Sequence, residues 1–300
     1  MKQKFIEWSP KEKTRDLIDQ ADDIISEYDT AGYILTVRQL YYQFVARGII
    51  ANSERSYKNL GRIITKARMS GMLSWSSIED RNRQHHGYWY DEDELSPIKD
   101  LPDYIRFDRW ARQEYYIEVW VEKEALGNVV SRACKPFLIP HMACKGYLSA
   151  SEAWRSGRRF RNKIVGGKRC ILIHLGDHDP SGIDMTRDNI DRLNIFTGFP
   201  EEVEVIRLAL NMDQVEEYQP PPNPTKISDS RAQEYIKRFG YTSWELDALD
   251  PAILESKIKR EVNKYINKEV WDAVVVEERE MKDMLSRVYQ EWDEIRPLVE

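Results

Sequence analysis

The sequence predicts an α/β protein in which a helical N-terminal domain precedes a parallel sheet flanked by helices and a helical C-terminal extension. Three observations lead to this prediction. Apolar residues recur at helical spacing up to about residue 69. Between residues 115 and 208, runs rich in β-branched and aromatic residues alternate with a helical stretch, as in a parallel sheet. From residue 251 onward, charged helix formers surround an apolar stripe.

Composition sets the class of protein. The 300 residues leave room for two domains, and the 41% hydrophobic fraction can build real cores. No apolar run approaches the roughly 20 residues needed to cross a bilayer, and the first residues lack the apolar segment of a secretory signal. The three cysteines (Cys134, Cys144 and Cys170) show no metal-binding or redox spacing. We therefore expect a cytoplasmic protein that does not enter a membrane and keeps its thiols reduced.

Residues 1–85 are expected to form the helical domain, and its first two helices have clear start and stop signals. A capping box with proline at the first helical position, residues 9–12, opens the first helix, and Gly32 ends it. A second capping box, residues 36–39, opens a helix that runs to Gly48. Both helices carry apolar residues three and four positions apart, so each is expected to bury one face.

A third helix and a wing complete this domain. The helix is expected over residues 53–69, and residues 72–78 look like a short strand or wing. Three helices followed by a wing in a basic stretch predict a winged-helix module, the kind that places one helix in a DNA groove. Residues 86–113 are acidic, polar and punctuated by prolines, so a linker is expected there.

Charge is distributed unevenly along the chain. The overall formal charge of −6 argues weakly against a nucleic-acid binder. It is a poor guide when positive and negative residues are segregated along the chain. Residues 36–84 hold nine basic and three acidic side chains, so this stretch carries +6 and the rest of the chain carries −12. The basic residues are Arg38, Arg47, Arg55, Lys58, Arg62, Lys66, Arg68, Arg81 and Arg83. Such segregation favours a nucleic-acid-binding N-terminal domain.

The third helix carries a cationic stripe. Spacings of three, four and four residues place four cations on one face: Arg55, Lys58, Arg62 and Lys66. The opposite side is apolar and is formed by Leu60, Ile63, Ile64 and Ala67. A recognition helix in the major groove of DNA has this arrangement. A solvated charged face is the alternative, but it would normally include interspersed glutamates, and only Glu54 is present.

A tyrosine pair lies in the second helix. Tyr41 shares a face with Val37, Leu40 and Phe44, so it is expected in the core. Tyr42 projects more than a right angle away from that face and lies one turn after Arg38. It could be a nucleophile whose phenolate Arg38 stabilises while also gripping a phosphate. An amphipathic surface tyrosine is the alternative interpretation.

Residues 114–220 are expected to form the α/β domain, and residues 221–300 its helical C-terminal extension. A helix is expected at residues 149–163. Strands are expected at residues 115–121, 170–175 and 203–208. Strands that alternate with helices form parallel sheets, and ligands of such sheets bind outside the carboxyl ends of the strands.

Acidic residues follow two of these strands directly. Glu122 comes at the end of the first, and Asp177 and Asp179 come just after the second. Two aspartates separated by one residue can point the same way, and a glutamate from a neighbouring strand can complete a site of hard oxygen ligands. Such a site suits Mg²⁺, which keeps several waters and bridges to substrate phosphate. Glu124 and Asp184 are possible accessory carboxylates.

A plainer interpretation of the two aspartates stays open. A helix is expected to begin near Pro180, and acidic residues before a helix often cap its free N–H groups. The neighbouring histidines, His174 and His178, are interpreted as structural.

Four motifs, in one order, resemble a known family. Residues 36–42 match its tyrosine motif, residues 121–125 its first metal-site motif, residues 145–147 a glycine turn after the second strand, and residues 177–184 its D-x-D motif. The chain in this respect resembles the A-subunit family of topoisomerase VI and its meiotic double-strand-break relatives, which join a winged helix to a Toprim domain. The length is most similar to the short stand-alone A-subunit homologues of bacterial chromosomes and mobile elements.

The resemblance implies roles for individual residues and for partners. Tyr42, the second tyrosine of the pair, would be the nucleophile, and Glu122, Asp177 and Asp179 would hold Mg²⁺. Lys145, in the glycine turn, is a possible accessory residue. The resemblance also implies a homodimer in which one subunit's tyrosine meets the other's metal site. A separate ATPase B-type subunit is a possible partner, since the chain has no ATP-binding motif of its own.

Three functions are compatible with these features. The leading hypothesis is a Mg²⁺-dependent DNA transesterase of the type IIB topoisomerase A-subunit kind, which cleaves double-stranded DNA and forms a 5′-phosphotyrosine link through Tyr42. The second is a hydrolytic Toprim nuclease in which the same carboxylates serve hydrolysis and Tyr42 only binds DNA. The third is a non-catalytic module that binds DNA or another partner.

Overall fold

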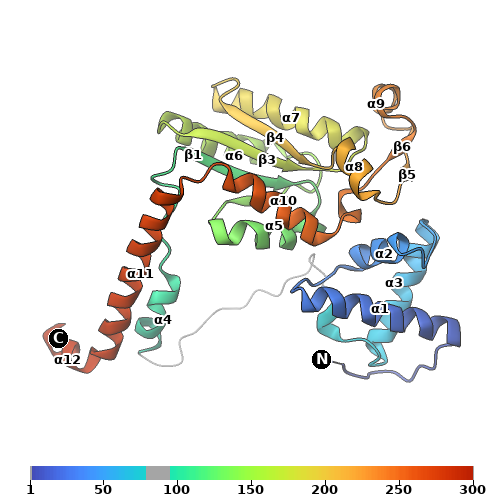
Figure 1. Ribbon diagram of the computed structural model, residues 1–300, viewed down its shortest axis with the longest axis horizontal. Coiled ribbons are helices and arrows are strands. Elements are labelled where there is room, and N and C mark those ends of the chain that lie inside the picture. Colours follow the sequence, from blue (N-terminus) through green and yellow to red (C-terminus); the bar gives the residue numbers. More distant parts are fainter. Residues whose placement is uncertain (1, 79–94, 300) are drawn as a thin grey trace.

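Residues 2–78 and 95–299 are described in the computed structural model, which contains a helical module, an α/β unit and a helical arm (Figure 1). The helical module consists of residues 2–78, and Figure 1 places it beside the α/β unit, with the arm at the opposite end. Two basic residues of the predicted positive stretch, Arg81 and Arg83, lie outside the described residues. Among the described helices, none is both long and apolar enough to cross a membrane.

Three helices form the helical module, and two of their predicted starts are confirmed. They are α1 (Glu12–Thr30), α2 (Val37–Ala46) and α3 (Glu54–Met69). Thr36 and Gln39 form the predicted capping box of α2, and Ser53 caps α3 by accepting a hydrogen bond from the Ser56 amide. The capping box predicted at residues 9–12 is wrong. Because Lys11 is extended, with a ψ of 156°, α1 begins at Glu12 without a side-chain cap.

The predicted strand or wing at residues 72–78 is also wrong. This segment contains a 3-10 turn, η1 (Trp75–Ser77), and Ile78 makes only an isolated bridge to Leu35. Local hydrogen bonds explain the difference. The Ser77 hydroxyl donates to the Ser74 carbonyl at 2.6 Å, and Arg68 donates to the Trp75 carbonyl at 2.8 Å. Serine side chains that bond to nearby backbone compete in this way with strand pairing.

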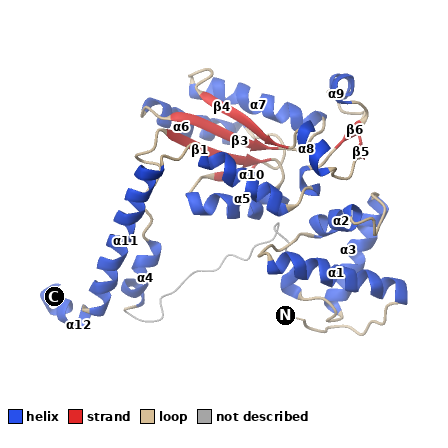
Figure 2. Ribbon diagram, viewed as in Figure 1, coloured by secondary structure: helices blue, strands red, loops and turns tan. Residues whose placement is uncertain are grey.

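A four-stranded parallel sheet forms the centre of the α/β unit (Figure 2). Its order is β2-β1-β3-β4, and all three neighbouring pairs are parallel. The strands are β1 (Tyr115–Val121), β2 (His141–Ala143), β3 (Arg169–Leu175) and β4 (Val203–Ala209). The predicted strands at residues 115–121, 170–175 and 203–208 are therefore confirmed, and the sheet is parallel as expected.

Helices cover both faces of the sheet, so its two central strands are buried on both sides. Ile117, Val119 and Val121 of β1 pack into one core with α5 (Gly127–Cys134) and α10 (Pro251–Asn263). Tyr116 and Trp120, on the other face, pack into a second core. Its helices are α6 (Ala150–Val165) and α7 (Pro180–Thr197). The alternation of β1 side chains between two cores is the period of two that a strand imposes.

Short elements join the larger ones. The turns η2 (Glu124–Leu126) and η3 (Lys135–Phe137) flank α5, and η4 (Leu246–Ala248) precedes α10. The remaining helices of this part are α8 (Met212–Tyr218) and α9 (Ala232–Phe239). A two-stranded antiparallel pair consists of β5 (Asn223–Pro224) and β6 (Thr242–Ser243).

The arm is formed by α4 (Ser96–Tyr104), α11 (Lys268–Gln290) and α12 (Trp292–Val299). Figure 1 shows α4 alongside α11, away from the helical module. The predicted linker at residues 86–113, which lies partly outside the described residues, therefore contains a helix. One of the prolines that suggested a linker, Pro97, lies in the first turn of this helix, where proline is favoured. Packing against α11, together with the hydrogen bond from the Phe107 amide to Glu278 at 3.0 Å, holds this segment in place.

Polar contacts dock the helical module onto the α/β unit. The Tyr28 hydroxyl donates to Asp250 at 2.5 Å, and the Tyr33 hydroxyl donates to Glu255 at 2.6 Å. Asn52 donates to the Pro222 carbonyl at 2.9 Å. An interface of charged and phenolic groups resembles the contacts between separable domains more than a hydrophobic core.

Candidate functional site

Two strand ends lie side by side and carry the predicted acidic residues. Val121 of β1 is paired with Leu175 of β3, so Glu122 and Asp177 follow neighbouring positions in the sheet. The Asp177 amide donates to Glu122 Oε2 at 2.9 Å. The structure therefore brings Glu122 and Asp177 together at the carboxyl edge of the sheet, where ligands of parallel α/β folds bind.

Asp177 is almost completely enclosed, with 5% of its surface exposed. Its Oδ1 accepts a hydrogen bond from the Leu246 amide at 2.8 Å, and its Oδ2 lies 2.9 Å from Lys123 Nζ. Burial raises the pKa of Asp177, and the positive charge of Lys123 opposes that rise. Both carboxylate oxygens of Asp177 are thus engaged by groups of the chain itself.

Asp179 has the role that the plainer interpretation assigned to it. It is the N-cap residue of α7, and its Oδ1 accepts a hydrogen bond from the Gly182 amide at 2.6 Å. Asp179 also acts on Glu122: burial raises the pKa of Glu122, and the negative charge of Asp179 adds to the rise. Asp179 therefore caps a helix and at the same time lies within electrostatic range of the strand-end glutamate.

The fit of these carboxylates to Mg²⁺ differs from one to the next. Glu122 uses Oε2 and Asp179 uses Oδ1 in the hydrogen bonds described, which leaves one oxygen of each for a cation that keeps several waters. Asp177 meets a cation of the chain, Lys123, instead. Within residues 2–78 and 95–299, no group of three or more His, Cys, Asp or Glu side chains is arranged as a ready metal site.

A network of ion pairs connects these strand ends to the helical module. Lys123 Nζ lies 2.6 Å from Glu245 Oε2 and 2.9 Å from Asp247 Oδ1. Arg38 of α2 pairs with the same two carboxylates, and its Nε lies 2.9 Å from Asp247 Oδ2. We call the five residues of this cluster the strand-end network: Arg38, Lys123, Asp177, Glu245 and Asp247.

Sequence reasoning missed Lys123, Glu245 and Asp247. Glu245 and Asp247 follow Lys123 by more than 120 positions, so no local periodicity relates them. A signal was available, however. Glu245 and Asp247 are two acidic residues separated by one position, the same spacing that singled out Asp177 and Asp179.

Arg207 was missed as well. This β4 residue donates to the carbonyls of Asp177, at 2.5 Å, and Gly182, at 2.9 Å. Burial lowers its pKa to about 10. Arg207 therefore ties the loop that carries both aspartates to the neighbouring strand.

Tyr41 is buried in the core as predicted, but the position predicted for Tyr42 is wrong. Tyr42 was expected outside the apolar face, yet only 4% of its surface is exposed. It packs against Tyr41, with ring centroids 5.2 Å apart, in the same cluster as Ala248 of η4. A segment distant in sequence thus supplies a second buried face to α2. Burial, followed by the charges of Asp247 and Glu245, raises the pKa of the Tyr42 phenol. The Arg38 guanidinium lies 5.8 Å from its ring centroid, so the two side chains are neighbours as predicted, while stabilisation of a phenolate by Arg38 stays a prediction.

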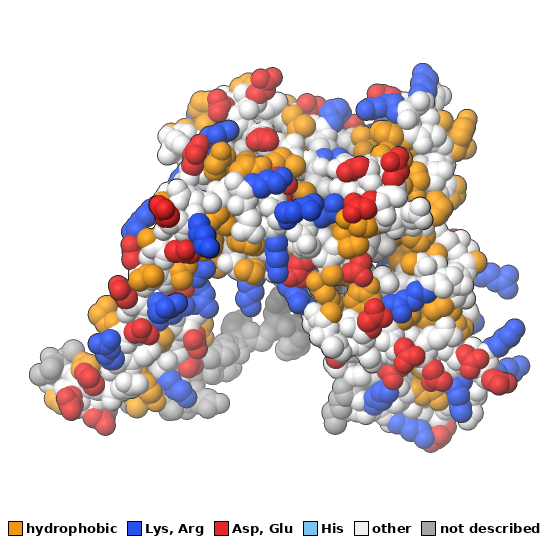
Figure 3. Space-filling model, in the orientation of Figure 1, with side chains coloured by type: hydrophobic (Ala, Val, Ile, Leu, Met, Phe, Trp, Pro, Cys, Tyr) orange, Lys and Arg blue, Asp and Glu red, His pale blue; other side chains and the backbone are white. Residues whose placement is uncertain are grey.

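The faces predicted for α3 are confirmed. Its four cations (Arg55, Lys58, Arg62 and Lys66) are exposed, and its apolar residues (Leu60, Ile63, Ile64 and Ala67) are buried. We call the four cations the basic face of α3. Figure 3 shows Lys and Arg side chains projecting from the outer edge of the helical module.

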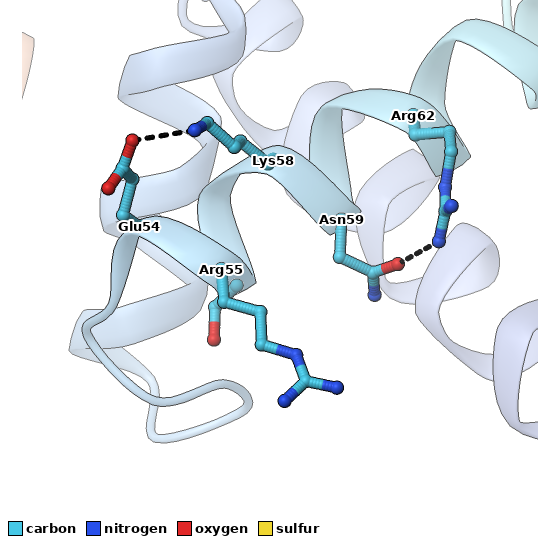
Figure 4. Close-up of a pocket in the computed structure, with 6 residues that line it drawn as sticks. Glu54, Arg55, Lys58, Asn59 and Arg62 are labelled. Atoms are coloured by element: carbon cyan, nitrogen blue, oxygen red, sulfur yellow. Dashed lines mark hydrogen bonds and ion pairs between the residues drawn. The ribbon is translucent and has the colours of Figure 1, made fainter.

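An open hollow of about 850 Å³ follows the basic face of α3. In Figure 4, Lys58 pairs with Glu54 at 2.7 Å, Arg62 donates to Asn59 at 2.8 Å, and Arg55 extends away from the helix. The contacts of Lys58 and Arg62 are with neighbours on the same helix, whereas Lys66 Nζ lies 5.8 Å from the ring centroid of Trp8. DNA as the ligand of the basic face stays a prediction.

The accessory residues fall into two places. Glu124 and Lys145 form an ion pair of 2.8 Å and, with Arg38 and Glu122, line a cavity of about 300 Å³ beside the strand-end network. Asp184 lies elsewhere, where it accepts from Tyr147 at 2.6 Å and pairs with Arg187 and Arg231. The structure therefore groups Glu124 and Lys145 with the site.

Both histidines near the site make interior contacts, and neither is grouped with the carboxylates. His174 Nδ1 lies 2.9 Å from the Thr186 hydroxyl, and His178 Nδ1 lies 2.7 Å from the Tyr235 hydroxyl. Burial lowers the pKa of His174 to about 3 and that of His178 to about 4. Both rings are therefore neutral near neutral pH.

A search against protein families finds no matching family, and a search of curated proteins finds no match. The resemblance to the topoisomerase VI A-subunit family therefore rests on the four motifs alone.

Proposed function

We propose that this protein binds double-stranded DNA and cleaves it by Mg²⁺-dependent transesterification through Tyr42, in the manner of a type IIB topoisomerase A-subunit. One observation carries the proposal. The strand-end network joins Arg38, the neighbour of Tyr42, through Glu245 and Asp247 to Lys123 after β1 and, through Lys123, to Asp177 after β3. A tyrosine, a guanidinium and several carboxylates from distant parts of the chain thus lie close together, and these are group types that phosphodiester chemistry uses.

Each group has a distinct task in this reaction. The basic face of α3 binds the DNA backbone as the recognition helix of the three-helix module. Arg38 orients the scissile phosphate by paired hydrogen bonds. The Tyr42 oxygen forms a bond to phosphorus, and the bond from phosphorus to the 3′ oxygen breaks. The phenol loses its proton to solvent, and the departing 3′ oxygen takes up a proton from solvent. The products are a 5′-phosphotyrosine link and a free 3′ hydroxyl.

Glu122 and Asp179 would hold the metal ion, and Asp177 would join them only where Lys123 releases it. A bound Mg²⁺ would supply positive charge close to the phosphate oxygens. The fit rests on donor chemistry, since carboxylate oxygens with water ligands suit this ion.

The proposal requires the helical module to move. Tyr42 is buried and Arg38 is paired with two carboxylates in the docked arrangement, so neither can meet a phosphate there. Opening exchanges the charged partners of the interface for ions, water or phosphates and exposes Tyr42, which is buried in a cluster that includes Ala248. In a homodimer, an undocked module would reach the strand ends of the second subunit, and a separate ATPase subunit could drive the movement.

A hydrolytic nuclease is the second candidate, and the burial of Tyr42 favours it. With 4% of its surface exposed and its pKa raised, the phenol is a poor nucleophile in the docked arrangement. In this candidate, water takes the place of Tyr42 and the DNA keeps free 5′ ends.

The test is incubation of supercoiled DNA with the protein and Mg²⁺, followed by denaturation with and without protease. Transesterification predicts linear or nicked DNA that enters the gel normally only after protease treatment. Cleaved DNA that migrates freely without protease would favour hydrolysis. DNA that is retarded before denaturation but uncut after it would reduce the function to binding.

A further inference from the structure

Lys123 contacts three carboxylates, whereas a simple ion pair has one. Its ammonium lies 2.9 Å from Asp177 Oδ2, 2.6 Å from Glu245 Oε2 and 2.9 Å from Asp247 Oδ1. An ammonium group has three N–H donors, and here three carboxylates are within reach of them. The position of the nitrogen is therefore defined from three directions.

These carboxylates have little access to water. The exposed fraction of the side chain is 8% for Asp177, 27% for Glu245 and 0% for Asp247, and that of Lys123 is 18%. Buried carboxylates without a cation repel one another strongly. Lys123 thus supplies, from within the chain, the positive charge that such a cluster otherwise takes from a bound cation.

The same carboxylates also connect to the helical module. Glu245 and Asp247 pair with Arg38, and the Leu246 amide between them donates to Asp177 Oδ1 at 2.8 Å. The segment at residues 245–247 is therefore held by Arg38 from one side and by Lys123 and Asp177 from the other. A substitution of Lys123 should therefore affect both the end of β3 and the contact with α2.

We propose that Lys123 is a positioning residue that orients Asp177 at the end of β3 and fixes residues 245–247, to which Arg38 of the helical module is paired. The inference rests on the proposed function, because it states how Arg38 and Asp177 are held relative to each other before DNA binds. Lys123 itself is not placed in contact with the DNA.

The first measurement is hydrogen exchange of the Leu246 amide in the full-length chain without DNA or metal. Lys123→Met removes the charge and keeps the bulk of the side chain. We expect Leu246 to exchange about 100-fold faster, because removing one partner of a buried ion cluster destabilises its surroundings. The amide of Ile173, in the central strand β3, should accelerate much less, because its exchange follows global stability. Lys226→Ala, at an exposed position, is the matched control.

Chemical rescue separates positioning from a general loss of structure. Lys123→Ala leaves space for a small amine, and we expect ethylammonium to restore slow exchange at Leu246. Tetramethylammonium, which has no N–H donor, should not, and neither amine should act on Lys123→Met, in which the space is filled. Equal effects of both amines, or rescue of the methionine variant, would overturn the inference.

A second variant keeps the test decisive where Lys123→Met folds but is too unstable for exchange measurements. In Lys123→Met, Arg38 is the remaining cation of the strand-end network, which contains three carboxylates. Adding Asp247→Asn removes one of these negative charges, so the double variant should unfold at a higher temperature than Lys123→Met. An equal or lower unfolding temperature contradicts the inference. So does unchanged exchange at Leu246, or equal acceleration at Leu246 and Ile173. All these measurements are made without DNA. Their outcome therefore does not depend on whether the proposed cleavage reaction occurs.

Discussion

Two charged regions of the molecule, the basic face of α3 and the strand-end network, differ in how they are built. The cations of α3 lie on one helix, are exposed, and make their contacts with near neighbours such as Glu54 and Asn59. The strand-end network joins four separate segments and is mostly buried. Its Arg38 and Glu245 are 207 positions apart.

This difference indicates which site can bind a ligand without rearrangement and which must rearrange first. An exposed row of cations can bind a polyanion without any change in the protein, since its counter-ions are free to leave. A buried cluster must first exchange one set of charged partners for another, which is costly when a partner is removed and modest when it is replaced. DNA binding and chemistry are therefore expected to be separable steps.

The largest effect should come from removing a buried carboxylate of the strand-end network. The Asp247 side chain is 0% exposed and pairs with both Lys123 and Arg38. Asp247→Ala removes this shared partner, so we expect a loss of about 3 kcal/mol or more in unfolding free energy. The matched change on α3 is Glu54→Ala, which removes an ion pair with side chains 78% and 72% exposed and should cost less than about 0.5 kcal/mol. Urea unfolding of both variants measures the contrast, and similar losses would contradict it.

The loop that carries the aspartates should tolerate no added bulk. A Cβ at Gly182 would lie 2.3 Å from the Asp177 carbonyl oxygen, which is backbone and cannot rotate away. Gly182→Ala is expected to lower the unfolding free energy by about 3 kcal/mol and to disturb Arg207. Gly127→Ala, at a helical position with nothing within 4 Å, is the control and should be neutral or stabilising. Thermal unfolding distinguishes them, and a harmless Gly182→Ala would refute the close packing described.

A buried carboxylate of the arm extends the comparison to pH. Burial by itself would raise the pKa of Glu278, but hydrogen bonds from Lys282 and the Phe107 amide outweigh it and lower the pKa from 4.5 to about 2. Because the folded pKa is depressed, Glu278 stabilises the fold above about pH 4.5, and this contribution is lost as the pH falls toward 2.

Glu278→Gln should therefore cost about 2 kcal/mol at pH 6 and much less near pH 2.5. Thermal unfolding of the wild type and the variant at several pH values measures the difference. A gap that stays constant with pH would show that the carboxylate charge has no such role.

The smallest effects should come from the basic face of α3. Single changes of Arg55, Lys58, Arg62 or Lys66 to alanine should each weaken DNA binding by a similar amount for every sequence, about 1 kcal/mol or less for each cation removed. The salt dependence of the binding constant should also fall by about one unit of slope for each phosphate that is no longer neutralised. Fluorescence anisotropy at several salt concentrations measures both, with Lys226→Ala as the control. Unchanged slopes would indicate that DNA binds to another surface of the protein.

Sequence reasoning predicted what is decided locally. The faces of α3 follow from helical spacing, and the strands β1, β3 and β4 follow from β-rich runs, because each pattern lies within one element. The approach of Glu122 to Asp177 could also be predicted, since parallel strands bring their carboxyl ends to one edge.

What it could not predict depends on distant segments. Tyr42 is buried because η4 covers it, and Asp177 is engaged because Lys123 and the Leu246 amide reach it. Serine turns stand where a wing was predicted at residues 72–78, because they compete locally with strand pairing. Long-range partners, and not local propensity, set the details of the candidate site.

The central claim is that Tyr42, Arg38 and the strand-end carboxylates belong to one DNA-cleaving site. The most direct measurement traps covalent protein–DNA adducts by rapid denaturation of the protein with end-labelled DNA, with Mg²⁺ or with a chelator. We predict adducts that need Mg²⁺, carry the protein on the 5′ end and vanish in Tyr42→Phe. Adducts that persist in Tyr42→Phe, or cleavage that leaves free 5′ ends in the wild type, would contradict the claim.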